Sequence, residues 1–143
     1  MQSPIRVMSI MAHQDDFEFN AGGLFAWLRR HYGDRVELKI LATTRGASGH
    51  QTMGLEETFR IREKEAQASA NVIGASYECL NLLDNSHAIG QVFLDRNTLG
   101  GLWNAIRDFR PDFIICPSSP TRAPAFISTT TTRPGPSATW PIS

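Results

Sequence analysis

The chain has 143 residues, no formal net charge and two isolated cysteines, which predicts one domain with a hydrophobic core and argues against nucleic acid as a partner. No run approaches the roughly 20 apolar residues of a membrane helix, and Met1–Pro4 lack the basic residues of a signal peptide, so we expect a cytoplasmic protein without a membrane segment. Cys79 and Cys116 lack zinc-knuckle spacing and are expected to be buried thiols in a reducing compartment.

Strands and helices alternate between residues 5 and 116. Apolar runs predict four strands, at residues 5–11, 36–43, 77–82 and 112–116. Periodic apolar residues predict three helices, one beginning near Asn20, one at residues 56–73 and one at residues 95–109. This alternation predicts an α/β fold, a Rossmann-like parallel sheet with helices on both faces, truncated after the fourth strand.

The first strand leads directly into the polar residues His13-Gln14-Asp15-Asp16. Ligand sites of open α/β sheets lie just beyond the carboxyl ends of the strands. An imidazole and two carboxylates at this place supply two metal ligands and a base. Simple helix capping by Asp16 or Asn20 is the alternative interpretation. A phosphate site is disfavoured, since no glycine-rich phosphate loop follows the strand and carboxylates repel phosphate.

The composition changes after the fourth predicted strand. All fourteen acidic residues lie at or before Asp112, whereas residues 117–143 contain six prolines and a run of four threonines. No strand or helix periodicity is visible there, so a disordered linker or a mucin-like tail is one interpretation. We therefore divide the chain into residues 1–116, the N-terminal part of an α/β domain, and residues 117–143, an irregular tail.

Four segments resemble the signatures of the PIG-L/LmbE-like de-N-acetylases over residues 5–116. Ala12–Asp16 is similar to the family's Ala-His-Pro-Asp-Asp motif, and Leu41–Gly49 to its Thr-x-Gly-x-x-Gly loop. Arg62–Glu65 resembles the Arg-x-x-Glu helix, and Leu80–Asp84 the Leu-Gly-x-x-Asp stretch. Order and spacing agree across all four segments.

The resemblance implies a hydrolase that uses zinc or another divalent metal to remove the acetyl group from a GlcNAc-type N-acetylated amino sugar conjugate. It implies that His13 and Asp16 are metal ligands and that Asp15 is the general base for a metal-activated water. It further implies that Arg62 contacts the sugar and that Asp84 binds a hydroxyl group. For Arg62, an i,i+3 surface ion pair with Glu65 remains the alternative.

Two departures from the family pattern matter. Gln14 stands where the family has proline, which removes no ligand. More seriously, the family takes a third metal ligand from a His-x-Asp-His segment after the fourth strand, and this chain has no histidine beyond His87. His31, His50 and His87 are expected to be solvated residues, with His50 the best substitute because its loop borders the site.

The unusual tail suggests a reading-frame hypothesis. If the codons of Phe126–Thr130 are read one base earlier, suitable codons give His-Leu-Asp-His-His, which contains the missing pattern. Residues from about 118 would then be a frameshift product, and the present chain would be an impaired deacetylase. The competing hypothesis is a non-catalytic α/β binding module with a weak metal site, and a homo-oligomer remains open in either case.

Overall fold

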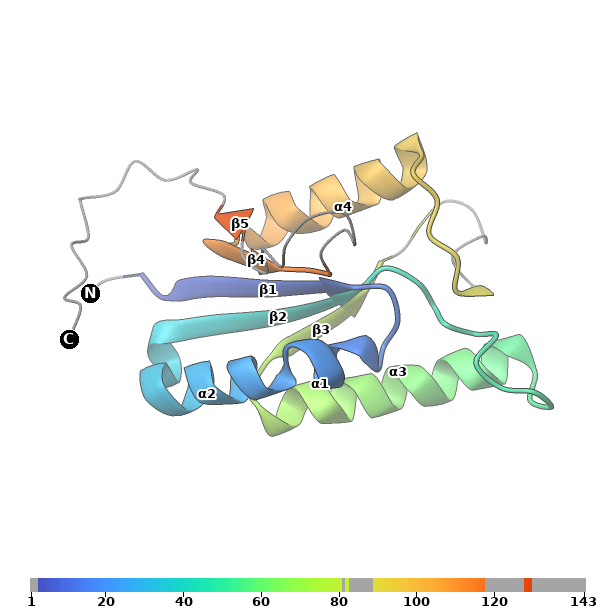
Figure 1. Ribbon diagram of the computed structural model, residues 1–143, viewed down its shortest axis with the longest axis horizontal. Helices are drawn as coiled ribbons and strands as arrows, with labels where there is room; N and C mark the ends of the chain where they lie inside the picture. Colours follow the sequence, from blue (N-terminus) through green and yellow to red (C-terminus); the bar gives the residue numbers. More distant parts are fainter. Residues whose placement is uncertain (1–2, 81, 83–88, 118–127, 130–143) are drawn as a thin grey trace.

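The computed structural model describes residues 3–80, 82, 89–117 and 128–129, which form one five-stranded sheet with helices on both sides (Figure 1). The strands lie in the order β3-β2-β1-β4-β5. Their bounds are β1 Ile5–Met11, β2 Val36–Ala42, β3 Ser76–Cys79, β4 Phe113–Ile115 and β5 Ser128–Thr129. Strands β1 to β4 are parallel to one another, and β5 runs antiparallel to β4. The predicted α/β class and parallel sheet are confirmed.

β1 is the central strand of the sheet, and its apolar residues are buried on both faces. It pairs with β2 from Ile5↔Val36 to Met11↔Ala42 and, on its other edge, with β4 from Val7↔Phe113. Side chains alternate between the two faces of a strand. Val7 accordingly belongs to one buried cluster, and its neighbour Met8 belongs to another.

The helices divide between the two faces (Figure 1). Their bounds are α1 Asp16–Asn20, α2 Gly22–Tyr32, a 3₁₀ turn Gly33–Arg35, α3 Leu55–Val72 and α4 Arg96–Phe109. Phe17 of α1, Phe25 of α2 and Ala70 of α3 are buried against the face that carries Val7. Ala105 of α4 is buried with Met8 on the opposite face.

Several predicted boundaries need correction. Residues 16–20, expected to be loop, form the separate helix α1, and β3 ends at Cys79 rather than at residue 82. In β3 the paired register with β2 ends at Ala42↔Cys79, so the chain leaves the sheet there. Cys79 and Cys116 are free but half-buried, not fully buried.

The predicted tail falls mostly outside the described residues. Residues 118–127 and 130–143 are not described, so the division at residue 117 and the frameshift hypothesis stay predictions. Ser128 and Thr129, which are described, pair with Ile114 and Phe113 as the short strand β5. In the described part of the chain, no helix has the length and hydrophobicity to cross a bilayer.

Candidate active site at the carboxyl ends of the strands

The loops that follow β1 and β2 lie side by side, because these two strands are parallel neighbours. The backbone N–H of Thr44 donates to the carbonyl oxygen of Ala12 at 3.0 Å, and the Thr44 hydroxyl donates to the same oxygen at 2.7 Å. From β1 the chain adds β2 and β3 on one edge and then returns to add β4 on the other edge of β1. The order in which strands are added therefore reverses beside β1. Such a switch point leaves a crevice at the strand ends, and the polar cluster occupies this position.

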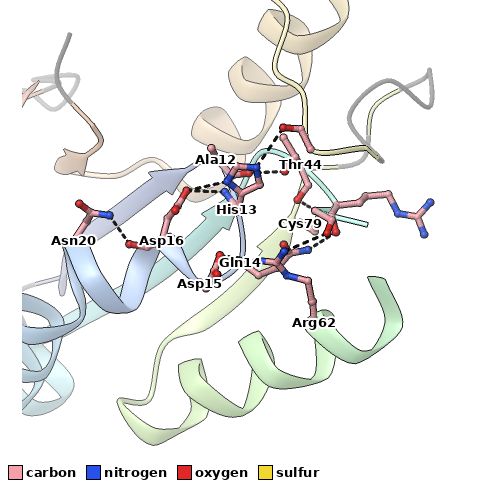
Figure 2. A network of polar contacts seen from close by, with 12 residues as sticks. Ala12, His13, Gln14, Asp15, Asp16, Asn20, Thr44, Arg62 and Cys79 are labelled. Carbon is pink, nitrogen blue, oxygen red and sulfur yellow. Dashed lines mark hydrogen bonds and ion pairs between the residues drawn. The ribbon is translucent and has the colours of Figure 1, made fainter. Parts of the chain in front are cut away.

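The structure brings His13 and Asp16 together (Figure 2). The backbone N–H of His13 donates to Asp16 Oδ2 at 2.9 Å, and His13 Nδ1 lies 3.4 Å from the same oxygen. Two ligand atoms of a tetrahedral zinc site are also separated by about 3.4 Å, given bond lengths near 2.0–2.1 Å. The pair therefore has the spacing of two ligands that share one ion.

A neighbouring carbonyl group fixes the orientation of the imidazole. His13 Nε2 lies 3.3 Å from the carbonyl oxygen of Gly90. Since a carbonyl only accepts, this contact is a hydrogen bond when Nε2 carries the ring hydrogen, and a neutral ring of that form has its Nδ1 lone pair on the side of Asp16. Ligating histidines are commonly held in this way by their second nitrogen. Gly90 suits the contact because its φ is +85° and a Cβ there would lie 3.3 Å from Nε2.

The chemistry of this pair fits a divalent metal, but the pair supplies only two ligands. Imidazole and carboxylate are ordinary zinc ligands, and a catalytic zinc site uses three protein ligands. Among the described residues, no group of three His, Cys, Asp or Glu side chains could hold a metal ion. The segment in which the resemblance places a third ligand lies largely in the residues that are not described.

Asp15 faces away from this pair and contacts α3 instead. Its Oδ1 accepts a hydrogen bond of 2.6 Å from the guanidinium of Arg62, and the Asp15 side chain is 65% exposed. The other guanidinium nitrogen donates to the carbonyl oxygen of Gly46 at 3.2 Å. The i,i+3 pair of Arg62 with Glu65 is not formed between these described residues, so that alternative is wrong. No local sequence pattern indicates the contact between Asp15 and Arg62.

The interpretation of Asp16 or Asn20 as a simple helix cap is wrong as well, because the residues that precede α1 and α2 are Asp15 and Ala21. Asp15 is the residue before α1, and its side chain makes no capping hydrogen bond within the described structure. The Asp16 carboxylate accepts from His13 instead, and Asn20 donates to the Asp16 backbone carbonyl at 2.7 Å. Asp16 therefore shapes the loop that carries His13.

Gln14 ties the two loops together from a buried position. Its Nε2 donates to the carbonyl oxygen of Arg45 at 2.7 Å, which joins the loop after β1 to the loop after β2. Gly46 follows with φ +55°, and a Cβ at Gly46 would lie 2.5 Å from Gln14 Oε1. The side chain that stands in place of proline thus has a structural role that its sequence position did not reveal.

The other predicted or alternative site residues lie elsewhere. His50 is exposed, and its Nδ1 accepts the backbone N–H groups of Thr52 at 3.2 Å and Met53 at 3.0 Å, so this nitrogen is occupied. His31 stacks on a tryptophan at the far end of α2. Asp84 and His87 lie outside the described residues, so their predicted roles stay predictions.

Cys79, the last residue of β3, is a free thiol next to the loop after β2. It is 3.5 Å from the carbonyl oxygen of Thr44. Burial raises the pKa of the Cys79 thiol to about 12, and the nearby Glu63 carboxylate adds to this effect. Burial and a hydrogen bond donated to Glu63 also raise the pKa of Tyr77. The thiolate is the metal-binding form of cysteine, and burial and the Glu63 carboxylate both disfavour it at Cys79.

Solved structures with the same fold include enzymes of two kinds. The chain is 25% identical to the N,N'-diacetylchitobiose deacetylase from Pyrococcus horikoshii, with a TM-score of 0.64 over 78% of this chain and 40% of that one. It is also 25% identical to GalB, the 4-carboxy-2-hydroxymuconate hydratase from Pseudomonas putida KT2440, with a TM-score of 0.64 over 82% of this chain and 49% of that one. A teicoplanin-pathway deacetylase, 18% identical with a TM-score of 0.61 over 78% of this chain and 50% of that one, shares the fold.

These comparisons also place limits on the assignment. The chain spans half or less of the length of these structural relatives. No curated protein matches the sequence. The family model of GlcNAc-PI de-N-acetylases, however, matches residues 8–124, which include both loops of the site. Since that match covers most of the sequence, the chain belongs to the PIG-L (GlcNAc-PI de-N-acetylase) family.

Proposed function

We propose that this protein is a metal-dependent de-N-acetylase that acts on an N-acetylated amino sugar of the GlcNAc type. The observation that carries the proposal is the approach of His13 Nδ1 to Asp16 Oδ2 at 3.4 Å, directly after the central strand. Family membership and the 25% identity to a deacetylase support the same reaction.

His13 and Asp16 would hold the metal, which we take to be zinc. When bound, a zinc ion would supply polarisation of the acetyl carbonyl and a water of lowered pKa. The His13 side chain is prepared for this task because Gly90 occupies its other nitrogen. The loop is held in place because Asp16 also accepts the backbone N–H of His13.

Asp15 would act as the general base. Its carboxylate is mostly exposed, and only Oδ1 is engaged by Arg62, which leaves Oδ2 to accept a proton from the attacking water. The water oxygen bonds to the acetyl carbon, the C–N bond breaks, and the proton held by Asp15 passes to the leaving amine. Acetate and a free amino sugar are the products. Arg62 keeps the Asp15 carboxylate in position throughout.

We further propose that the present chain is an impaired member of its family. Its described residues offer two metal ligands where a catalytic zinc site uses three. A water position that is poorly defined by two ligands would slow the reaction. The competing hypothesis of a non-catalytic binding module predicts, in contrast, no acetate release at any zinc concentration.

A hydratase is the second candidate function. The hydratase GalB is as similar to this chain as the chitobiose deacetylase is, with 25% identity and a TM-score of 0.64 in each case. In that case the site residues would direct water onto a carbon atom of a different substrate. The PIG-L family match favours the deacetylase.

Acetate release from an N-acetylglucosamine derivative tests the proposal. The purified chain should release acetate when Zn²⁺ is added, and excess chelator should stop the release. The Asp34→Asn variant, which changes an exposed aspartate in the 3₁₀ turn away from the site, serves as a control and should match the unchanged protein. Turnover of 4-carboxy-2-hydroxymuconate without acetate release would favour the hydratase. Activity with neither substrate, at any zinc concentration, would contradict the enzyme assignment.

A further inference from the structure

Two consecutive backbone carbonyl groups connect the imidazole of His13 to the loop after β2. The Ser48 hydroxyl in that loop donates to the carbonyl oxygen of Ile89 at 2.6 Å. The carbonyl oxygen of the next residue, Gly90, lies 3.3 Å from His13 Nε2. Ile89 and Gly90 follow β3 in the chain, so segments that follow three parallel strands meet at the ring of His13.

Gly90 is confined between the Ser48 hydroxyl and the His13 ring. Its φ is +85°, and a Cβ there would lie 3.3 Å from His13 Nε2 and 3.6 Å from Ser48 Oγ. Both side chains therefore approach the same point of the backbone. A change at Ser48 reaches the carbonyl group that faces His13 through a single peptide unit.

The loop after β2 also holds the backbone next to His13 (Figure 2). The Thr44 hydroxyl and the Thr44 backbone N–H both donate to the carbonyl oxygen of Ala12, at 2.7 and 3.0 Å. Thr44 is fully buried, whereas Ser48 is exposed. The loop thus fixes the backbone before His13 at Thr44, and four residues later it reaches the imidazole through Ile89 and Gly90.

These contacts distinguish the two nitrogens of the His13 ring. The Gly90 oxygen occupies the position in front of Nε2 where a ligand of that nitrogen would lie. Nδ1 is on the side of Asp16, 3.4 Å from its Oδ2. In histidine ligands, the hydrogen bond of one ring nitrogen decides which nitrogen binds the metal. The position of the Gly90 carbonyl is therefore a property on which metal binding depends.

We propose that Ser48 is a positioning residue that makes Nδ1 the metal-binding nitrogen of His13. The Ser48 hydroxyl holds the carbonyl group of Ile89, this fixes the carbonyl group of Gly90, and the Gly90 oxygen accepts the hydrogen of Nε2. The inference rests on the proposed function only in taking His13 as a metal ligand. The location of the ring hydrogen is a property of the metal-free protein and does not depend on any activity.

Nitrogen NMR of the histidine rings in the metal-free protein tests the first part of this proposal. His13→Gln identifies the His13 signals, and the spectra are recorded at a pH at which the ring is neutral. In the unchanged chain we expect the hydrogen on Nε2, and in Ser48→Ala a larger share of the form with the hydrogen on Nδ1. Ser48→Thr, which keeps the hydroxyl group, should restore the original spectrum. A hydrogen on Nδ1 in the unchanged chain, or identical spectra for the unchanged chain and Ser48→Ala, would overturn the proposal.

Zinc titration of the same variants tests the second part. Ser48→Ala should weaken zinc binding about three- to tenfold, the effect of one neutral hydrogen bond. Ser76→Ala is the matched control, because Ser76 is also exposed and its hydroxyl also donates to a backbone carbonyl, that of Leu38, at the opposite end of β3. It should bind zinc as the unchanged chain does. Equal zinc affinity in Ser48→Ala and Ser76→Ala would contradict the proposal. If the unchanged chain binds no zinc, the proposed function fails, and the NMR spectra alone decide whether Ser48 sets the ring hydrogen.

A matched pair of glycine variants separates positioning from stability. Gly90 and Gly33 both have positive φ, +85° and +55°, so Gly90→Ala and Gly33→Ala should both lower the unfolding temperature. A Cβ at Gly33 meets no described atom within 4 Å, whereas one at Gly90 crowds His13. Gly90→Ala should therefore also weaken zinc binding by at least about threefold, and Gly33→Ala should not. Loss of zinc affinity to the same extent in both variants would show that general destabilisation, and not the position of the Gly90 carbonyl, controls the site.

Discussion

Asp15 and Asp16 are consecutive in the sequence, but their carboxylates belong to different neighbourhoods (Figure 2). Asp16 lies with His13, 3.4 Å from its Nδ1, and both side chains are about one-third exposed, at 35% and 38%. Asp15 lies with Arg62 at 2.6 Å and is 65% exposed beside a cavity. The first neighbourhood is an imidazole–carboxylate pair, for which we propose a metal, and the second is a carboxylate–guanidinium pair, for which we propose proton transfer.

The start of α1 explains how neighbouring residues are separated. Asp15 precedes the helix with helix-like backbone angles, and Asp16 is its first residue. Successive side chains of an α-helix point about 100° apart. One carboxylate therefore turns toward His13, and the other turns toward α3. The short helix α1, which the sequence did not predict, therefore gives two adjacent acids different partners.

The largest effect should come from adding a third metal ligand to the pair His13 and Asp16. If the gene encodes the one-base-earlier frame from about residue 118, the resulting protein gains a His-Leu-Asp-His-His segment in place of Phe126–Thr130. Three ligands should hold zinc orders of magnitude more tightly than two. Zinc content after dialysis, measured for both proteins, checks this expectation. Equal zinc retention would remove the frameshift hypothesis and the proposed impairment together.

On the proton-transfer side, Asp15→Asn should lower the rate of acetate release by about 10²–10⁴-fold. The amide preserves the shape of the side chain but does not accept the proton of the attacking water. The KM should change little, because the side chain is not expected to hold the acetyl group. A variant rate within a few-fold of the original would show that Asp15 is not the base.

Arg62→Met should have a smaller effect on the same side. Its loss releases the Asp15 carboxylate, and misplacement of a catalytic group by about 1 Å costs up to about 10²-fold in rate. Arg62→Lys, which retains the positive charge, should recover part of kcat. If the loss instead appears only as a higher KM, Arg62 contacts the sugar as the family resemblance implies, and it does not position Asp15.

The sequence predicts contacts between residues that are close together along the chain better than contacts between residues that are far apart along it. β1 at Ile5–Met11 and the proximity of His13 to Asp16 follow from local patterns, a buried apolar run and an i,i+3 spacing. The Asp15–Arg62 pair joins residues 47 positions apart, so no local pattern indicates it. The same holds for Gln14 and Arg45, whose contact depends on two loops that meet only in the folded sheet.

The smallest expected effect concerns Cys79, which contacts the loop after β2 at Thr44. Its pKa is raised from 9.0 to about 12, mainly by burial. A raised pKa means that the neutral thiol is favoured by folding, so its stabilising contribution is complete below about pH 9 and is lost as the pH rises toward 12. The unfolding free energy should therefore decline over this range, and Cys79→Ala should make the decline shallower. An unchanged slope in the variant, followed by chemical denaturation, would show that Cys79 does not contribute.

Zinc titration of the unchanged chain, Asp15→Asn and Asp16→Asn tests the division between the two aspartates most directly. The two variants remove the same charge from adjacent positions, so each is the control for the other. We predict that Asp15→Asn binds zinc as the unchanged chain does, and that Asp16→Asn loses affinity by at least about 10- to 100-fold, the loss seen when even a supporting residue of a metal site is removed. Loss of zinc in Asp15→Asn, with binding retained in Asp16→Asn, would contradict the account.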